Sequence, residues 1–474
     1  MRAIFFSALV PAIAAAVGVV AFGMLGDRGI IALIAGMTVF LVGIVVWKRP
    51  DLALTAAFPV LVCTPFFLSF GSAPRIYADQ TLLIALYGVV TLKILLRAEP
   101  TNLGWMDIFA PAFSLAMLGM TLLVNQSSLE AIRGFLEIMC FSMPLCVLCA
   151  HIATARTAER TAMVLAFAVI VVAMIGAAEV LYGSNPIMEY ASERHEGEFA
   201  YISGEMVAAS DAFYRPYAVF SNPSEGGTVV ALCLPFIAVL LGGEKKFWRV
   251  AAGAALAAGF VFVVLTATRG VWFSLFLTTI LFLPRFRKAC VLAAPVFAGG
   301  LFMSSFFFSR MRLWDRIADF RNLRIRFWYW EQALSLAENN ALFGLGFGNF
   351  ATSYLSLDPA ISTEFAADIN QVMTVDNMFL MILVEQGVFG LAGFLLLCGF
   401  LFLRLFKTRS FSIAQGRPRS ADFALAAMAC LCIYLFCGVL ADVHLFNKAT
   451  KLVFMLSGMG WGLSLNTQEK YGSP

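Results

Sequence analysis

The chain has 474 residues, of which 61% are hydrophobic and 13% are charged, and its formal net charge is +4. Soluble domains hold about 45–50% apolar and about 25% charged residues, so this composition excludes an ordinary soluble enzyme. The apolar residues form continuous runs of about 17 or more, which indicates helices that cross a bilayer and excludes the alternating strands of a membrane barrel.

These runs predict about fourteen membrane spans, and therefore an all-α, polytopic membrane protein with about 12–14 transmembrane helices in a single membrane domain, 1–474. The first run continues past an alanine-rich stretch at 13–16, which favours a signal-anchor over a cleaved signal peptide. In chain order the spans are 3–25, 29–47, 52–70, 80–97, 105–124, 129–151, 160–182, 226–243, 249–267, 270–284, 289–307, 378–406, 421–441 and 450–465.

Lysine and arginine residues predict the orientation, because short cytoplasmic loops carry an excess of both. If the N-terminus is cytoplasmic and the spans alternate, every cytoplasmic loop is basic, whereas the outer turns at 26–28 and 125–128 hold one basic residue between them. Both termini are therefore expected in the cytoplasm. The basic loops contain Lys48, Arg49, Lys93, Arg97, Arg156, Arg160, Lys245, Lys246, Arg249, Arg285, Arg287, Lys288, Arg404, Lys407, Arg409, Arg417 and Arg419.

Two long loops are then expected on the outer side. Residues 183–225 are acidic in the middle, and residues 308–377 begin with a helical pattern in which arginines alternate with aromatic residues. A basic, aromatic helix of this kind lies along a membrane surface or covers a cavity. Its positive charge agrees with an outer location, since long loops are translocated largely regardless of charge.

Arginines gather at the outer ends of the predicted spans. A guanidinium matches phosphate oxygens in bidentate geometry, so the cluster indicates binding of a lipid-linked phosphate or diphosphate. The alternatives are an ion pair with Glu137 one turn later, snorkelling at the interface, and contact with anionic headgroups. The arginines are Arg75 after the third span, Arg133 early in the sixth, Arg215 before the eighth and Arg269 at the end of the ninth.

A carboxylate lies at the outer edge of the span 378–406. Asp376 precedes this span and is followed by Asn377, so it is either the N-cap of a helix or a reactive group. Glu385 lies over two turns deeper, where a carboxylate either accepts a structural hydrogen bond or relays a proton.

No residue spacing is typical of a metal site. The histidines are His151, His195 and His444, and all ten cysteines lie in apolar runs, where they are interpreted as small buried side chains. The acidic residues at 193–198 are interpreted as a solvated loop. We therefore expect no metal, no cofactor and no nucleic-acid partner.

Four motifs follow one another in the second half of the chain. They are Arg215 with Phe220 and Pro223; Thr266-Ala267-Thr268-Arg269-Gly270-Val271-Trp272; Arg326 and Trp330 with Gly344, Gly346, Gly348 and Phe350; and Asp376-Asn377 with Gly387 and Gly390. In this order they resemble the O-antigen ligase and O-antigen polymerase superfamily of bacterial surface-polysaccharide enzymes. Thr268 replaces the usual serine, and Asp376 stands where the ligases carry histidine, which favours a polymerase-like member.

The resemblance implies a glycosyltransferase that polymerises polyprenyl-diphosphate-linked repeat units into an exopolysaccharide or O-antigen, by inverting, metal-independent transfer at the periplasmic face of the inner membrane. Arg215, Arg269 and Arg326 would stabilise the leaving diphosphate, and Asp376 would deprotonate the acceptor hydroxyl. The lipid bilayer, a chain-length regulator and a flippase are the further partners expected. The substrate-binding residues expected are Arg75, Arg133, Asn377, Trp330, Gly346 and Gly348.

Two alternatives stay open. A ligase would transfer the glycan from polyprenyl diphosphate to a lipid or protein acceptor. A transporter or flippase of lipid-linked sugars would instead show charged residues near the bilayer midplane and broken spans.

Overall fold

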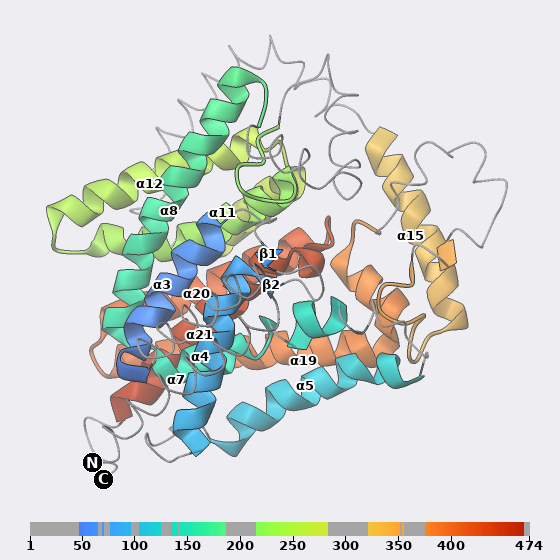
Figure 1. The fold of residues 1–474 in the computed structure, drawn as a ribbon, viewed down its shortest axis with the longest axis horizontal. Helices are drawn as coiled ribbons and strands as arrows, with labels where there is room; N and C mark the ends of the chain where they lie inside the picture. Colours follow the sequence, from blue (N-terminus) through green and yellow to red (C-terminus); the bar gives the residue numbers. More distant parts are fainter. Residues whose placement is uncertain are drawn as a thin grey trace, which may run out of the picture. The chain divides into compact units, whose positions relative to one another are not determined.

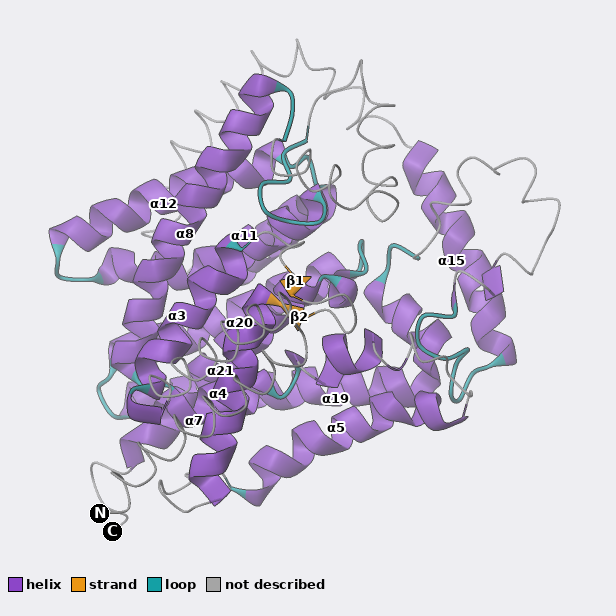
Figure 2. Ribbon diagram, in the orientation of Figure 1, coloured by secondary structure: helices purple, strands orange, loops and turns teal. Residues whose placement is uncertain are grey.

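The computed structural model describes residues 47–64, 69–70, 76–95, 104–124, 132, 134–140, 142–185, 215–282, 321–350, 353–354 and 375–468. Helices dominate these ranges, and the strands within them are β1 (Ser69–Phe70) and β2 (Ile76–Tyr77), an antiparallel pair with Phe70 opposite Ile76 (Figure 2). The fold is therefore all-α, as the apolar runs predict. Its contacts group into two compact units, residues 1–101 and 102–474.

The first unit contains α3 (Pro50–Cys63) and α4 (Ala78–Leu95), which pack against each other. The predicted span 52–70 is wrong in its second half, because α3 ends at Cys63. Thr64 adopts an extended conformation, which is what the residue before a proline (Pro65) prefers. At 1.5 Å per residue α3 is about 21 Å long, shorter than the ~30 Å core of a bilayer.

Figure 1 shows the described helices of the second unit. They are α5 (Trp105–Val124), α7 (Leu145–Ile152), α8 (Ala155–Tyr182), α11 (Pro223–Val239) with the 3-10 turn η2 (Leu240–Gly242), α12 (Lys246–Leu265), an unlabelled helix Arg269–Phe282, α15 (Arg321–Asn339), α19 (Met378–Ala414), α20 (Pro418–Gly438), the 3-10 turn η3 (Val443–Leu445) and α21 (Asn447–Gln468).

Five helices among the described residues are long and apolar enough to cross a membrane: Ala155–Tyr182, Pro223–Gly242, Lys246–Leu265, Met378–Ala414 and Pro418–Gly438. Shorter apolar helices are Pro50–Cys63, Trp105–Met120 and Arg269–Phe282. These helices agree with a polytopic membrane protein. The predicted spans 3–25 and 289–307 and most of 29–47 lie outside the described residues, so the count of 12–14 stays a prediction.

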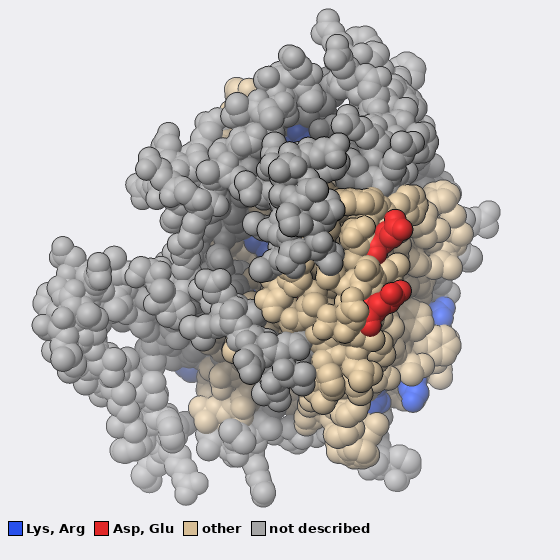
Figure 3. Space-filling model, turned by 90° about the vertical axis from the view of Figure 1, so that its right-hand side faces the viewer, with Lys and Arg blue, Asp and Glu red and all other residues tan. Residues whose placement is uncertain are grey.

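Helix α20 lies at the centre of the second unit and contacts α11, α19 and α21. In α20 and in α11, 78% of the most apolar stretch is buried, compared with 28% in α12. The outer helices instead expose large apolar side chains, such as Met174 on α8 and Phe247 on α12. The described part of the face in Figure 3 is also mostly uncharged. An apolar exterior of this kind suits lipid rather than water.

The predicted span 129–151 is not one continuous helix. Leu136–Cys140 form a π-helical segment, designated η1, and a turn at Met143–Pro144 precedes α7. Pro144 has no N–H, and its ring crowds the carbonyl group four residues earlier, which favours a break at this position. Arg133 lies outside the described residues, as does the side chain of Glu137, and their ion pair stays a prediction.

Helix α21 approaches α7 closely through small residues. A Cβ atom at Gly458 or Gly462 would overlap the backbone of Cys146 or Ala150. Glycines four residues apart on one face allow two helix backbones to meet in this way, as is common in membranes. This contact anchors α7 after the break at Pro144.

The helix ends of the second unit form two groups. At the first, which we call the site end, α21 begins beside the first turn of α11, where the Lys448 N–H donates to Glu225 Oε1 over 3.3 Å. At the other, which we call the basic end, Arg419 Nη1 pairs with Glu159 Oε1 at 2.5 Å, joining the starts of α20 and α8. Arg404 of α19 pairs there with Asp107 of α5. Every candidate site residue that the structure describes belongs to the site end.

Candidate active site

Arg215 holds the turn that follows α12. Its Nε donates to the Thr266 carbonyl oxygen over 2.8 Å, and its Nη2 donates to Thr268 Oγ1 over 3.3 Å. Thr266 lies three residues and Thr268 one residue before Arg269, the first residue of the helix Arg269–Phe282. Two arginines that are far apart in the sequence are therefore joined through one short turn, which we call the arginine turn (residues 266–269).

The arginine turn is tight. Ala267 has a left-handed conformation with φ of 51°, and the Trp272 indole N–H donates to the Val263 carbonyl oxygen over 3.0 Å. Thr266 Oγ1 donates to the same oxygen over 2.8 Å. These bonds satisfy an orphan carbonyl at the end of α12 and fix where the next helix begins.

Arg326 and Asp376 form an ion pair, with 3.1 Å between Arg326 Nε and Asp376 Oδ2. Their side chains are 33% and 43% exposed, so solvent reaches both. Trp330 lies one turn after Arg326 on the same face of α15, and its indole N–H donates to the Val375 carbonyl oxygen over 3.1 Å. Helix α15 thus holds both the backbone and the carboxylate of the segment 375–376.

The structure separates the two interpretations of Asp376. The N-cap of α19 is Asn377, whose side chain accepts from the Leu380 N–H over 3.1 Å. Asp376 precedes this cap and has φ of 55°, a left-handed conformation that is uncommon outside glycine but less so for aspartate. A left-handed residue costs about 1–2 kcal/mol, which the surrounding contacts must offset. The N-cap interpretation of Asp376 is therefore wrong.

Two effects shift the pKa of the Asp376 carboxyl group in opposite directions. Desolvation by the surrounding protein raises the pKa of its carboxyl group above the ordinary value of 3.8, and the charge and hydrogen bond of Arg326 lower it. Desolvation is the larger effect, so the pKa is raised overall. A carboxylate with a raised pKa is a stronger base than a solvated aspartate.

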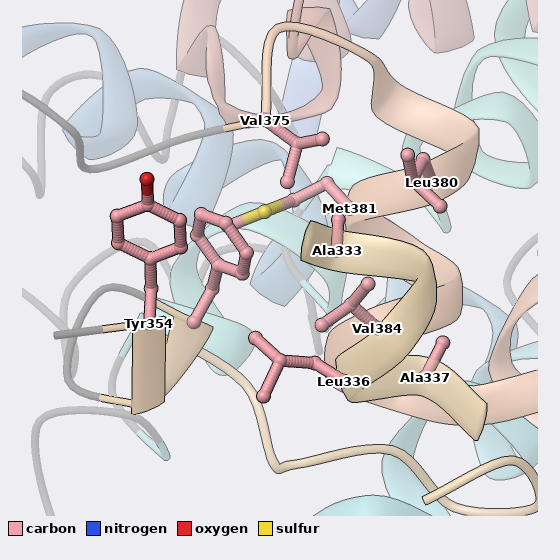
Figure 4. Packing of buried hydrophobic residues seen from close by; sticks show 9 residues of the cluster. Ala333, Leu336, Ala337, Tyr354, Val375, Leu380, Met381 and Val384 are labelled. Atoms are coloured by element: carbon pink, nitrogen blue, oxygen red, sulfur yellow. The ribbon is translucent and has the colours of Figure 1, made fainter. Parts of the chain in front are cut away.

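An apolar cluster fixes α15 against the start of α19 (Figure 4). Each large aliphatic side chain that is buried in such a contact stabilises it by about 1.5–3 kcal/mol. Trp328, Tyr329 and Trp330 pack against its edge. The arrangement places Arg326 one turn or more from the cluster, toward Asp376. The cluster consists of Ala333, Leu336, Ala337, Phe350, Tyr354, Val375, Leu380, Met381 and Val384.

Helix α19 is broken at Gly387, which has φ of 67° and ψ of −171°, a conformation essentially restricted to glycine. The segment 341–346 replaces the lost helical partners. The amides of Val388 and Phe389 donate to the carbonyls of Ala341 and Leu342 over 2.8 and 3.3 Å. In return, the amides of residues 345 and 346 donate to the carbonyls of residues 384 and 385 over 2.9 and 2.8 Å. The break therefore leaves these backbone groups paired, as a membrane interior requires.

This exchange accounts for the run of glycines after α15. The Gly346 amide is bonded to the Glu385 carbonyl, and backbone hydrogen bonds from Gly348 and Phe350 reach the Glu385 side chain. The structure shows both glycines in contact with α19, and their substrate-binding role stays a prediction. Glu385 is a buried hydrogen-bond acceptor, one of its two interpretations from sequence.

We expect Gly387→Ala to destabilise the protein by about 3 kcal/mol or more, since a Cβ atom would overlap the Leu342 carbonyl and alanine disfavours this φ. The measurement is the melting midpoint of the purified protein in detergent. Gly399→Ala is the matched control, because it lies in the same helix with open space around its Cβ position. It should stabilise the helix by about 0.5–1 kcal/mol. Equal midpoints for the two variants would contradict the strained break.

The loop 439–446 between α20 and α21 connects the arginine turn to Asp376. A Cβ atom at Gly270 would lie 3.2 Å from Leu440 Cβ, so Leu440 packs directly against the start of the helix that carries Arg269. Two residues later, Asp442 Oδ2 accepts a hydrogen bond of 2.7 Å from the Asp376 N–H. Since two residues span at most about 7 Å, the arginine turn and Asp376 are neighbours in space.

Sequence reasoning missed several buried charges at the site end, among them Asp442, Glu225 and Lys448. Asp442 is 4% exposed, Glu225 3% and Lys448 5%. Glu225 accepts from the amide and hydroxyl of Ser221, and Lys448 Nζ donates to the Val219 carbonyl over 3.3 Å while lying 4.9 Å above the Phe220 ring. For Asp442 and Lys448 the available signal was the charged loop between the last two apolar runs, because buried charges in membrane proteins are costly and mark functional regions.

Some predicted site residues cannot be located. Arg75 and Arg133 lie outside the described residues, as does most of the outer loop 183–225, including His195 and the acidic residues 193–198. Among the residues that the structure describes, no three His, Cys, Asp or Glu side chains are grouped as metal ligands. Metal-independent chemistry stays a prediction.

Comparison with known proteins identifies one family. Residues 254–395 match a family model described as O-Antigen ligase, and no curated protein matches the chain. The matched stretch includes Arg269, Arg326 and Asp376 and ends before Asp442. It supports the resemblance to the O-antigen ligase and polymerase superfamily, and broadly a glycan transfer of that type.

Proposed function

Because residues 254–395 match the O-antigen ligase family, we propose that this membrane protein is a glycosyltransferase that polymerises polyprenyl-diphosphate-linked repeat units into a bacterial exopolysaccharide or O-antigen. The observation that carries the proposal is the Arg326–Asp376 pair at 3.1 Å, beside the arginine turn. Transfer from a diphosphate needs cations for the leaving group and a base for the acceptor, and these elements meet at one end of the helices.

In the proposed reaction, Asp376 takes the proton from the acceptor hydroxyl as its oxygen attacks the anomeric carbon. The new bond forms between that oxygen and carbon, and the bond from carbon to the phosphate oxygen breaks with inversion. The diphosphate leaves with the bonding electron pair. Asp376 then returns its proton to water, which its 43% exposed side chain permits.

The arginines have different proposed tasks. Arg269 and Arg326 stabilise the negative charge that develops on the leaving diphosphate, since fixed positive groups act most strongly where charge accumulates. Arg215 donates two hydrogen bonds into the turn before Arg269, so it mainly orients that arginine. Trp330 and Asn377 hold the backbone on either side of Asp376. Roles for Arg75 and Arg133 in binding the same diphosphate remain part of the proposal.

The proposed location is the bacterial inner membrane, with both termini in the cytoplasm and the site end facing the periplasm. This orientation rests on the positive-inside rule. Lys245, Arg249, Arg404 and Arg419 all belong to the basic end, at the opposite ends of the helices that carry the site. The lipid-linked glycan and the bilayer are the proposed partners, together with a flippase and a chain-length regulator.

A ligase is the second candidate, because the matching family is described by that activity. It would use the same donor chemistry with a lipid or protein acceptor. A transporter is the candidate from another class, and the break in α19 at Gly387 beside the buried Glu385 is the feature that favours it. The re-pairing of this break by the segment 341–346 argues against it, since broken transporter helices line a substrate cavity.

Deletion of the gene separates the three candidates by the glycan that accumulates. A polymerase deletion should accumulate single repeat units on the polyprenyl carrier, accessible to a glycosidase added to the periplasm. Long chains on the carrier would instead establish the ligase. Single units that are protected from the glycosidase would establish the transporter. Supplying the wild-type gene should restore normal polymer.

The raised pKa of Asp376 predicts the pH dependence of the transfer rate. The base acts when it is deprotonated, so the rate should fall as the pH drops through the pKa of Asp376. Because desolvation raises this pKa above 3.8, the fall should begin at a higher pH than an ordinary aspartate would give. The measurement is the initial rate of the purified protein between pH 4 and pH 8, relative to its rate at pH 7. A rate that is constant down to the ordinary aspartate range would contradict this prediction.

A further inference from the structure

Asp442 lies beyond the stretch that matches the family, in the loop 439–446 near the C-terminus of the chain. Its side chain is 4% exposed, and its Oδ2 accepts a hydrogen bond of 2.7 Å from the Asp376 N–H. A hydrogen bond from an amide to a carboxylate is shorter and stronger than one between neutral groups. The length observed here is that of a charge-assisted bond.

The backbone of Asp376 needs such an acceptor. With φ of 55°, Asp376 lies outside α19, and its N–H has no helical partner. The residue before it is held through its carbonyl by Trp330, and the residue after it caps the helix. The direction of the Asp376 side chain follows from this backbone conformation, because the Cα–Cβ bond is fixed relative to the main chain. Asp442 therefore acts on the carboxylate through the peptide group.

The loop that carries Asp442 is itself held firmly. Thr450 Oγ1 donates to the carbonyls of Val443 and His444, each over 3.1 Å, and the Tyr434 hydroxyl lies 2.9 Å from the same Thr450 oxygen. These contacts tie η3 to both α20 and α21. On its other side, the loop packs through Leu440 against Gly270. The loop 439–446 is thus a rigid connection between the arginine turn and Asp376.

We propose that Asp442 is a positioning residue for the transfer reaction: it fixes the left-handed backbone at Asp376, so that the loop 439–446 sets the placement of this base relative to Arg269. The inference rests on the proposed function of Asp376. It assigns a role to a segment outside the family match and to a carboxylate that contacts Asp376 through the main-chain N–H.

The test compares Asp442→Ala with Asp442→Asn in purified full-length protein. The substrate is the lipid-linked repeat unit extracted from the deletion strain. Asp442→Ala removes the acceptor and should lower kcat about 10- to 100-fold with little change in KM, as expected when a reacting group is misplaced. Asp442→Asn keeps an acceptor oxygen and should retain most of the rate. Wild-type kcat in Asp442→Ala, or equal losses in both variants, would overturn the proposal.

A double variant and a control distinguish positioning from general instability. Adding Asp442→Ala to Asp376→Asn should cost nothing further, because the base is already absent. Asp107 is the matched control, since it is 3% exposed and its Oδ2 accepts from the Gly104 N–H over 2.8 Å at the basic end. Asp107→Asn should leave kcat per folded molecule unchanged.

The outcomes separate this inference from the proposed function. Near-normal activity of Asp376→Asn would overturn the proposed base, and the role of Asp442 with it. An inactive Asp376→Asn together with a fully active Asp442→Ala would overturn the inference alone. If Asp442→Ala does not insert into the membrane, the rate of Asp442→Asn decides between the outcomes. A loss of rate in Asp442→Asn as large as that in Asp376→Asn would contradict a role limited to accepting the hydrogen bond.

Discussion

Asp376→Asn is expected to lower the transfer rate about 100- to 10,000-fold, which is the usual contribution of a general base. The substitution preserves the shape of the side chain, and asparagine tolerates the left-handed conformation that Asp376 adopts with φ of 55°. The amide can no longer accept the proton of the acceptor hydroxyl at neutral pH. In cells, single repeat units on the polyprenyl carrier should accumulate although the protein inserts normally.

Glu331→Gln provides the control for this prediction. Glu331 is an exposed carboxylate on α15, little more than one turn beyond Arg326, so it tests whether loss of any negative charge in this region slows the reaction. We expect a normal rate and normal polymer from it. Normal polymer from Asp376→Asn at equal protein levels would remove Asp376 from the mechanism.

Arg326→Ala is expected to lower the rate about 100- to 1,000-fold, equivalent to about 2.7–4 kcal/mol of transition-state stabilisation. The loss has two sources. The leaving diphosphate loses a cation, and Asp376 loses the partner that lowers its pKa. Without Arg326 the pKa of Asp376 rises further, so the fall in rate on acidification should begin at a higher pH than in the wild type. The pH–rate profile of the purified variant measures both effects.

Two variants define the contribution of Arg326. Arg326→Lys keeps the positive charge and should restore part of the rate and most of the pH profile, but it loses the planar fork that matches phosphate. Arg249→Ala removes an exposed arginine from the basic end and should have no effect on either measurement. A full rate and an unshifted profile in Arg326→Ala would show that the ion pair is structural.

Composition and apolar runs predicted the helices well where each helix is continuous. The spans predicted at 105–124, 249–267 and 421–441 correspond closely to α5, α12 and α20. They failed where hydropathy continues through a change of backbone conformation. Pro144 interrupts one predicted span, and Gly387 follows only two polar residues, Glu385 and Gln386, in a long apolar segment, so neither position ended a predicted span.

The candidate site could be predicted only as separate pieces. The motif residues Arg326 and Asp376 were both expected, but 50 positions separate them, and their pairing depends on how α15 packs on α19. Asp442 lies 66 positions beyond Asp376 and belongs to no motif. Its role depends on a hydrogen bond from a main-chain amide. Every residue except proline has such an amide, so the bond leaves no pattern of residue types in the sequence.

The exchange of backbone hydrogen bonds at Gly387 has a consequence for how this site tolerates mutation. Four main-chain bonds join the segment 341–346 to α19, and they use backbone atoms rather than side chains. Gly344 and Gly387 are constrained, because a Cβ atom at either would overlap the backbone of the other segment. Apolar side chains around Arg326 and Asp376 are therefore free to diverge without losing the register between the two elements. The main chain thus helps to hold α15, and with it Arg326, in place relative to Asp376 while the surrounding side chains change.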